Sequence, residues 1–139
     1  MSYGEIVYRG FTRALSYRGR DTRAQFWWFT VTFWFLIGLY LGSILALDGN
    51  DDGPMAILIA VVFGVLLLWG LMGHIASAVR RLHDGNMSGW WATLFVVPYV
   101  AIAVYILCSL RGTSGENRFG HDPHLIADEV ARRRAAQAG

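Results

Sequence analysis

The chain has 139 residues, of which 55% are hydrophobic and only 16% are charged, and its twelve basic residues are all arginines. This length allows one domain, and the charged fraction lies below the roughly 25% that is usual for soluble domains. Three uncharged stretches exceed the ~18 apolar residues that indicate a membrane-spanning helix, and they cover residues 26–47, 54–79 and 88–110. A soluble bundle, a nucleic-acid-binding protein and a secreted disulfide scaffold are therefore excluded.

We predict an all-α integral membrane protein, a single membrane domain over residues 1–139 with three transmembrane helices. A short amphipathic helix precedes them and a short tail helix follows them. The amphipathic helix covers 2–17, where six apolar residues share one helical face: Tyr3, Ile6, Val7, Phe11, Ala14 and Leu15. Such a helix lies either in the headgroup plane or on the protein's own spans, and the sequence leaves both arrangements open.

The first span is predicted at residues 22–47, after a turn at 18–21. Thr22 and Gln25 have the spacing of a capping box, in which each side chain bonds the backbone N–H of the other. Trp27 and Trp28 follow at once, and such aromatic residues favour the membrane interface.

The second span is predicted at residues 54–79, and it is expected to pack against the first. Small residues four apart let two helix backbones approach closely, and the two spans carry Gly38, Gly42, Gly73 and Ser77 at that spacing. We favour contacts within one chain over a homodimer. His74 is the one titratable side chain in a span, and we expect a neutral, hydrogen-bonded ring, because the spans contain no carboxylate for a proton relay.

The third span is predicted at residues 88–110, with Pro98 near its middle. Proline removes one backbone donor, so we predict one kinked helix, and a hairpin that turns at Pro98 is the alternative. Residues 111–139 form a polar tail, in which Asp122 as cap and Pro123 at the first helical position predict a short helix.

The arginines predict the orientation of the chain in the membrane. With three spans, seven arginines close to span ends share one side, namely Arg9, Arg13, Arg18, Arg20, Arg23, Arg80 and Arg81. Cytoplasmic segments are rich in arginine, so the N-terminus is predicted to be cytoplasmic and the tail to lie outside. The five arginines of the tail oppose this arrangement. A cytoplasmic tail would require a re-entrant 88–110 segment or an inverted protein.

Two charged turns on the predicted cytoplasmic side form the candidate site. Arginine binds carboxylates and phosphates through two parallel hydrogen bonds, so these turns are candidates for binding lipid headgroups or a partner. The residues are Arg18, Arg20, Arg23, Arg80, Arg81, His83 and Asp84. The structural alternative, which we favour, is that Asp21 and Asp84 pair with these arginines and fix the helix ends.

No metal site, cofactor or catalytic residue is predicted. Residues 48–53 match the start of a calcium-binding loop, but the position that needs a glutamate is Ile59. His121 and His124 lack a third ligand, and no serine or cysteine nucleophile accompanies His83 and Asp84. Cys108 is the single cysteine, so no intrachain disulfide exists.

Three segments match motifs of a known family in the correct order. They are residues 19–27, residues 80–84 with 88–91, and residues 112–123. On these residues the chain resembles the bacterial domain of unknown function 805 family over about 16–124. Asn86 replaces the usual turn glycine, and His121 stands where proline is common. The resemblance implies a small multi-pass protein of the bacterial inner membrane and no established activity.

Three functions remain open on the sequence. We favour a non-enzymatic accessory or scaffold subunit that binds anionic lipid headgroups or a larger membrane-protein complex, and no nucleic acid. The first alternative is an oligomeric small transporter or channel component, which would assemble as a homo-oligomer through Gly38 and Gly42. The second is an enzyme that acts on an anionic headgroup at the cytoplasmic face, with Arg80, Arg81, His83 and Asp84 as its site.

Overall fold

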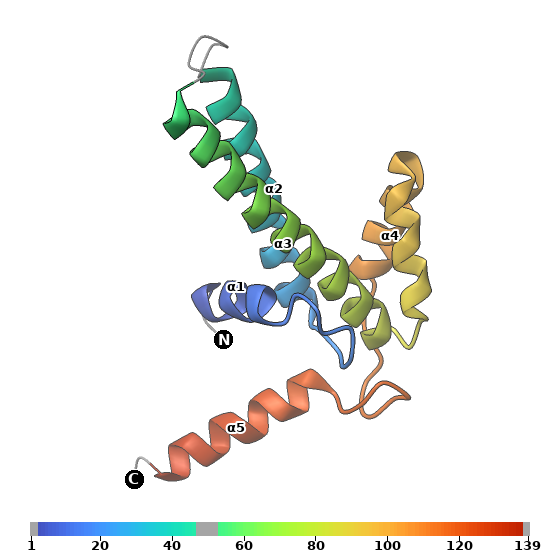
Figure 1. The fold of residues 1–139 in the computed structure, drawn as a ribbon. Helices are drawn as coiled ribbons and strands as arrows, with labels where there is room; N and C mark the ends of the chain where they lie inside the picture. Colours follow the sequence, from blue (N-terminus) through green and yellow to red (C-terminus); the bar gives the residue numbers. More distant parts are fainter. Residues whose placement is uncertain (1–2, 47–52, 138–139) are drawn as a thin grey trace.

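The computed structural model describes residues 3–46 and 53–137, and every regular element in this part of the chain is a helix (Figure 1). This agrees with the predicted all-α class. The elements are α1 Tyr3–Thr12, α2 Arg23–Ala46, α3 Pro54–Asp84, the 3-10 helix η1 Gly89–Val96, α4 Pro98–Ser109 and α5 Pro123–Gln137. Residues 48–53, which match the start of a calcium-binding loop, lie largely outside the described residues.

The helices α2 and α3 form a long antiparallel hairpin (Figure 1). The capping box that starts α2 is confirmed: the Thr22 backbone N–H donates to Gln25 Oε1 at 2.7 Å, and the Gln25 N–H donates to Thr22 Oγ1 at 3.2 Å. Pro54 starts α3, where its missing N–H leaves no helical bond unmade. Within the described residues, these two helices are long and apolar enough to cross a membrane.

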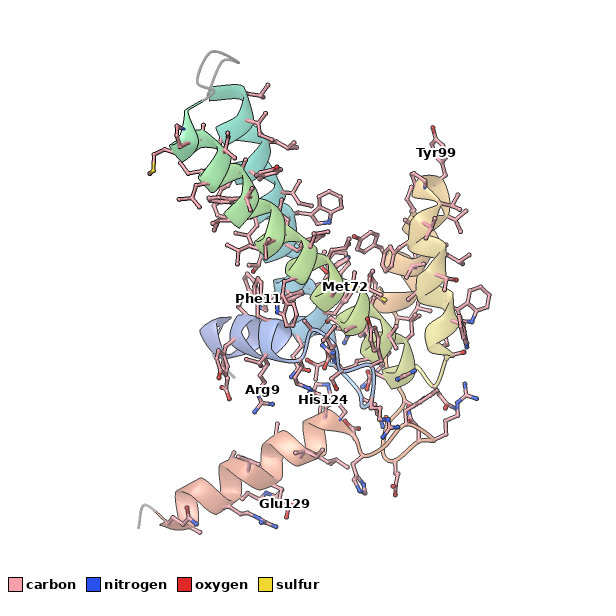
Figure 2. All side chains as sticks on the ribbon, viewed as in Figure 1. Arg9, Phe11, Met72, Tyr99, His124 and Glu129 are labelled. Carbon is pink, nitrogen blue, oxygen red and sulfur yellow. The ribbon has the colours of Figure 1, made fainter. Side chains whose placement is uncertain are left out.

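The hairpin changes character along its length. We call residues 31–46 and 54–69 the apolar arm, because large apolar side chains are exposed around both helices there, with Leu45 81% and Leu68 64% exposed. From Gly70 to Asp84, by contrast, most of α3 is buried, including both arginines. Figure 2 shows almost purely carbon side chains on the arm and nitrogen and oxygen gathered at the other end.

The predicted third span is not a continuous helix. The segment divides into η1 and α4, which lie side by side as a second, short hairpin (Figure 1). A residue before proline is driven towards extended backbone, and Val97 has φ −102° and ψ 108°, so the chain turns there and Pro98 begins a new helix. The count of three membrane-spanning helices is not confirmed, and the alternative hairpin describes this segment.

The helix α1 crosses α2 and α3 on one side (Figure 1). The Phe11 ring packs edge-on against Phe29 at 5.5 Å, and a Cβ at Gly10 would collide with the same Phe29 ring. Trp69 Nε1 of α3 donates to the Phe11 carbonyl oxygen at 2.9 Å. The face of α1 that carries Gly10 and Phe11 therefore packs on the protein's own helices, while Arg9 of the same helix is exposed.

The loop after α4 returns to the end of α3, and α5 extends away from the body (Figure 1). Arg20, which precedes α2, donates to carbonyl oxygens of this loop at Gly115 and Gly120. These bonds join the segment before α2 to the loop after α4, so the two segments lie at the same end of the molecule.

Candidate functional site

The polar end of the molecule is built around two buried aspartates, Asp21 and Asp84. We call this end the base: residues 13–22, the end of α3 from 77 to 84, and residues 108–122. Asp84 Oδ1 accepts from Arg20 Nε at 2.9 Å, and Oδ2 accepts from Arg81 Nη1. All three residues are buried, with 4%, 7% and 2% exposed. One carboxylate therefore joins the turn before α2 to the end of α3.

Asp21 forms the second ion pair of the base. Its Oδ2 accepts from Arg80 Nε at 2.8 Å and from Ser77 Oγ at 3.1 Å. Its backbone N–H also donates to the Arg80 carbonyl oxygen at 3.2 Å. The remaining Arg80 nitrogen Nη1 donates to the carbonyl oxygens of Arg13 and Ser16, so this arginine fixes the chain between α1 and α2.

The other donors of Arg20 and Arg81 reach the loop that follows α4. Arg20 donates to the carbonyl oxygens of Thr113, Gly115 and Gly120. Arg81 donates to those of Cys108 and Leu110. The planar guanidinium group carries five donors in a fixed arrangement, which allows one side chain to join a carboxylate to several carbonyl groups.

The loop fits closely against the end of α3. A Cβ at Gly112 would overlap the Asp84 carboxylate, so only glycine fits there. The backbone N–H and Oγ1 of Thr113 both donate to the Asp84 carbonyl oxygen, at 2.8 and 3.0 Å. Asn117 Nδ2 donates to the His83 carbonyl oxygen at 3.0 Å and to Thr113 Oγ1 at 2.8 Å.

His83 lies at the edge of the base and is held on both sides. Its ring stacks on Phe119 with centroids 3.8 Å apart and an angle of 7°, and Nδ1 is 3.3 Å from the Gly19 carbonyl oxygen. The Arg118 guanidinium lies over the Phe119 ring, 4.7 Å from its centroid. The ring is thus a packing element between three segments.

The turn after α3 keeps a left-handed backbone without glycine. Asn86 has φ 58°, a conformation that asparagine tolerates better than other residues with a side chain. The Asn86 carbonyl oxygen accepts from Arg118 Nη2 at 3.0 Å. The substitution of the usual glycine therefore preserves the turn.

Asp122 caps α5 and closes the loop, as predicted. Oδ1 accepts from the His124 N–H at 2.9 Å, and Oδ2 accepts from the Gly115 N–H at 3.1 Å. Partial burial by itself would raise the pKa of Asp122, but these two N–H groups and the nearby Arg20 charge outweigh it and hold the pKa below its usual value.

The buried charges can hold the base together, since burial is tolerated when ionised groups are paired and hydrogen-bonded. Among the predicted site residues, Arg20, Arg80, Arg81 and Asp84 direct their bonds to one another, to Asp21 or to backbone carbonyls. This is the arrangement of the structural alternative. Their burial leaves little surface for a ligand.

The other predicted site residues lie nearer the surface. Arg18 and Arg23 are exposed, and His83 is half-buried. Arg18 follows Tyr17 in the turn before α2, while Arg23 is the first residue of α2. These two arginines are the members of the set that remain accessible to an anionic group.

The predicted packing residues separate into two pairs. Gly73 and Ser77 are buried, and a Cβ at Gly73 would lie 2.9 Å from Phe29 Cζ and 3.1 Å from the Gly10 carbonyl oxygen. At Gly38 and Gly42, by contrast, a Cβ would meet nothing within 4 Å. Close backbone approach therefore occurs where α1 crosses α3 beside the base, and Gly38 and Gly42 of the apolar arm face open space.

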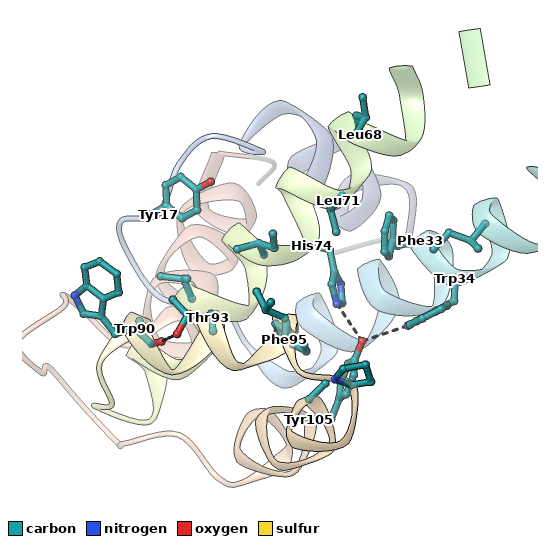
Figure 3. Close-up of a pocket in the computed structure, with 18 of the residues that line it drawn as sticks. Tyr17, Phe33, Trp34, Leu68, Leu71, His74, Trp90, Thr93, Phe95 and Tyr105 are labelled. Carbon is teal, nitrogen blue, oxygen red and sulfur yellow. Dashed lines mark hydrogen bonds between the residues drawn. The ribbon is translucent and has the colours of Figure 1, made fainter. Parts of the chain in front are cut away.

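A large open cleft separates the two hairpins, with a volume of about 1570 Å³ and mostly apolar walls. Three polar side chains meet in it: Tyr105 Oη lies 3.3 Å from Trp34 Nε1 and 3.1 Å from His74 Nε2 (Figure 3). The His74 ring also stacks on Phe33, with centroids 5.1 Å apart. The predicted hydrogen bond of His74 is thus present.

Sequence reasoning did not single out Tyr105, Trp34, Thr113 or Asn117. The first two are ordinary aromatic residues of apolar segments, so no spacing signal distinguishes them. Thr113 and Asn117 lie inside the third motif, whose specific residue types in a polar loop were the available signal. In the described parts of the chain, no three His, Cys, Asp or Glu side chains are grouped so that they could hold a metal ion.

Comparison with known proteins identifies relatives along most of the chain. Residues 14–121 match the family described as "Protein of unknown function (DUF805)". The chain is 33% identical to inner membrane protein YhaH of Escherichia coli strain K12 over 115 residues, which cover 80% of this chain and 89% of YhaH. It is 34% identical over 110 residues to inner membrane protein YhaI of the same strain, covering 78% and 86%. No solved structure matches significantly.

Proposed function

Because the chain belongs to the DUF805 family, whose relatives YhaH and YhaI are named inner membrane proteins, we propose that it is a non-enzymatic accessory or scaffold protein of the inner membrane. Both hairpins enter the bilayer from the cytoplasmic side. The base stays at the cytoplasmic surface as a rigid platform for headgroups and for a larger membrane partner. The buried ion pairs of the base are the observation that carries this proposal.

The base supports one orientation for the whole chain. It joins the segment before α2, the end of α3 and the loop after α4 by hydrogen bonds, so all three share one side of the bilayer. All twelve arginines then lie on that side, and the sequence carries no arginine between residues 24 and 79. Such an asymmetry marks the arginine-rich side as cytoplasmic. The N-terminus and the tail are both cytoplasmic, and the η1–α4 hairpin is re-entrant.

Reporter fusions test this orientation. A fluorescent protein fused after Gly139 is expected to fold and fluoresce, and alkaline phosphatase at the same position is expected to be inactive. Alkaline phosphatase inserted after Asn50 supplies the matched control and is expected to be active. An active phosphatase after Gly139 would overturn the orientation.

The scaffold role follows from how the charges are used. Arg20, Arg80 and Arg81 of the base are occupied by protein groups. Exposed arginines lie at the surface of the base and beside it, namely Arg9, Arg18, Arg23, Arg111 and Arg118. Basic side chains at a membrane surface attract anionic lipid, each by about 1 kcal/mol. The buried ion pairs therefore keep the base rigid, and the exposed arginines bind anionic headgroups.

Photo-crosslinking in native membranes tests the scaffold role. A photoreactive amino acid at Leu125 or Val130 samples the exposed surface of α5, and the same residue at Leu45 samples the lipid-facing arm as a control. The expected result is a specific protein adduct from α5, identified by mass spectrometry, and none from Leu45. The absence of any adduct from both α5 positions would argue against a protein partner.

One observation favours the alternative of an oligomeric transporter or channel component. Open space beside Gly38 and Gly42 could admit a second copy of α2. Light scattering of the purified chain in mild detergent distinguishes the two functions. A uniform monomer excludes the oligomeric alternative, while a stable oligomer that Gly42→Leu dissociates would support it.

A further inference from the structure

The Tyr105 hydroxyl group has an unusual set of partners in the cleft. Trp34 Nε1 can only donate, so Tyr105 Oη accepts from it at 3.3 Å. His74 Nε2 lies 3.1 Å away on the other side (Figure 3). His74 is 4% exposed, and its Nδ1 has no hydrogen-bond partner among the described residues. The tautomer of His74 therefore decides what the hydroxyl proton can do.

The two tautomers leave different groups unpaired. With the proton on Nδ1, a buried N–H would have no acceptor, and such orphaned donors are rare in proteins. With the proton on Nε2, the buried ring leaves only a lone pair on Nδ1 unpaired, and the Tyr105 hydroxyl proton that then lacks an acceptor lies in the open cleft, where an occupant can bond it. We therefore assign the proton to Nε2. Tyr105 Oη then accepts from both Trp34 and His74, and its own proton has no acceptor in the described part of the chain.

A free hydroxyl donor in an apolar cleft points to the chemistry of the occupant. Leaving such a donor unbonded away from water costs free energy, and the walls around it are otherwise apolar, with Phe33, Phe95, Leu71 and Ile102 among the lining residues. The occupant that suits both features has a long apolar chain and an acceptor oxygen at the level of Tyr105.

The position of α1 indicates how deep the Tyr105 hydroxyl lies in the membrane. Amphipathic helices lie at the boundary between headgroups and acyl chains. Along α3, α1 touches Trp69 and Gly73, while its Glu5–Arg9 ion pair of 3.5 Å faces outward. His74 is the next residue of α3. The Tyr105 hydroxyl is therefore level with the glycerol ester groups of the surrounding lipid.

The length of the cleft agrees with this depth. Gly64 lines its deep end and lies ten residues from His74, a rise of about 15 Å along a helix. One leaflet contributes about 15 Å, half of the roughly 30 Å hydrocarbon core. The cleft above Tyr105 therefore matches the acyl chains of a single leaflet.

The opposite end of the cleft carries positive charge. Tyr17, His83 and Phe119 line it there, and exposed arginines adjoin them: Arg18 follows Tyr17, and the Arg118 guanidinium lies 4.7 Å from the Phe119 ring. A phosphate at this end would meet complementary charge.

We infer that the cleft between the two hairpins binds one anionic glycerophospholipid of the cytoplasmic leaflet, whose ester carbonyl oxygen accepts a hydrogen bond from Tyr105. The acyl chains lie along α3 towards Gly64, and the anionic headgroup extends from the level of Tyr105 towards Arg118 and Arg18. This inference rests on the proposed orientation of the chain, and it adds a defined lipid site to the general attraction of arginines for headgroups.

Filling the deep end of the cleft tests the site. Gly64→Phe places a ring in the cleft without a clash, because a Cβ at Gly64 meets nothing within 4 Å. Gly38→Phe is the matched control: its Cβ also meets nothing within 4 Å, and Gly38 is not among the lining residues. The full chain is purified from native membranes in mild detergent, and phospholipid retained per protein is measured by mass spectrometry. We expect one phospholipid on the wild type and on Gly38→Phe, and little on Gly64→Phe.

Ester and ether lipids test the hydrogen bond. Wild type is offered equal amounts of diester and diether phosphatidylglycerol in mixed micelles, and the bound lipid is measured by native mass spectrometry. Loss of one carbonyl acceptor is expected to lower binding about two- to tenfold. Tyr105→Phe keeps the ring but removes the donor, so it should bind both lipids equally.

The outcomes separate this inference from the proposed function. Equal lipid retention by Gly64→Phe and wild type would overturn the cleft site, and equal binding of ester and ether lipids by wild type would overturn the role of Tyr105. A detergent dimer that Gly64→Phe abolishes would assign the cleft to a second copy instead. None of these results changes the reporter fusions or the α5 crosslinks, which test the proposed function alone.

Discussion

The apolar arm exposes apolar side chains and the base buries charged ones, although α3 runs through both. On the arm, large apolar side chains such as Leu68 and Val65 are more than half exposed. In the base, Arg80 and Arg81 are 2% exposed and an alanine such as Ala78 is fully buried. A soluble protein shows the reverse distribution.

This difference shows that the solvent changes along the helix. In lipid, exposed apolar side chains cost nothing, so the arm needs few internal contacts. At the surface, tertiary structure must come from specific bonds, and the paired aspartates and arginines supply them. The fold is thus held at one end.

The contrast between the apolar arm and the base predicts that the fold depends most strongly on Asp84. Asp84→Ala leaves Arg20 and Arg81 buried without their carboxylate, and removing one partner of a buried ion pair costs about 3–5 kcal/mol. We expect a large loss of unfolding free energy, measured in detergent by tryptophan fluorescence. Asp128→Ala on the exposed face of α5 is the control and should leave stability unchanged. Equal stability of the two variants would refute the role of the base.

Glycine substitutions compare the crossing of α1 and α3, beside the base, with the apolar arm. Gly73→Ala places a Cβ 2.9 Å from Phe29 and 3.1 Å from the Gly10 carbonyl oxygen, and such overpacking costs about 1–3 kcal/mol. Gly38→Ala on the arm meets nothing within 4 Å and should leave stability unchanged or slightly raised. The same unfolding measurement applies, and a destabilised Gly38→Ala would show that the arm also depends on close packing.

The loop after α4 can be tested as part of the base by Thr113→Val. This change keeps the shape but removes the Oγ1 bonds with the Asp84 carbonyl oxygen and Asn117, for an expected cost of about 1–2 kcal/mol. The exposed neighbour Ser114 provides the control as Ser114→Ala. Hydrogen exchange should quicken at Thr113 and Asn117 in the first variant only. Unchanged exchange there would mean that the loop is held by other contacts.

The smallest effect concerns Asp122 and pH. Because the folded pKa of Asp122 lies below its usual value, its contribution is present above the usual carboxyl range and is lost as pH falls through the folded pKa. Amide exchange at Gly115 and His124 should therefore quicken, once corrected for intrinsic rates, as the pH is lowered below about 4. Asp122→Asn should show weakened protection already at neutral pH. Protection that does not vary with pH in wild type would count against the cap.

Local signals in the sequence predicted much of the helical structure. The capping pair Thr22 and Gln25 located the start of α2, and Asp122 with Pro123 located the start of α5. These signals work because their bonds join residues two to four apart. The apolar stretches likewise predicted the long helices of the hairpin.

The conformation of the chain at Pro98 and the position of the tail depend on contacts between residues far apart in the sequence. Proline permits either a kink or a break, and the break at Val97 lets η1 and α4 pack together and brings Cys108 and Leu110 to Arg81. The orientation predicted from the arginines assumed that the third stretch crosses the membrane as one helix, and the structure divides this stretch into η1 and α4.

By itself, the sequence determined the helical class, the family and the two apolar helices, since composition and short-range spacing carry that information. It also named the charged residues that matter. Only the tertiary structure decided that Arg20 pairs with Asp84, because residues 64 positions apart meet only when the chain has folded. The same holds for Trp34, His74 and Tyr105, whose hydrogen bonds in the cleft join three helices.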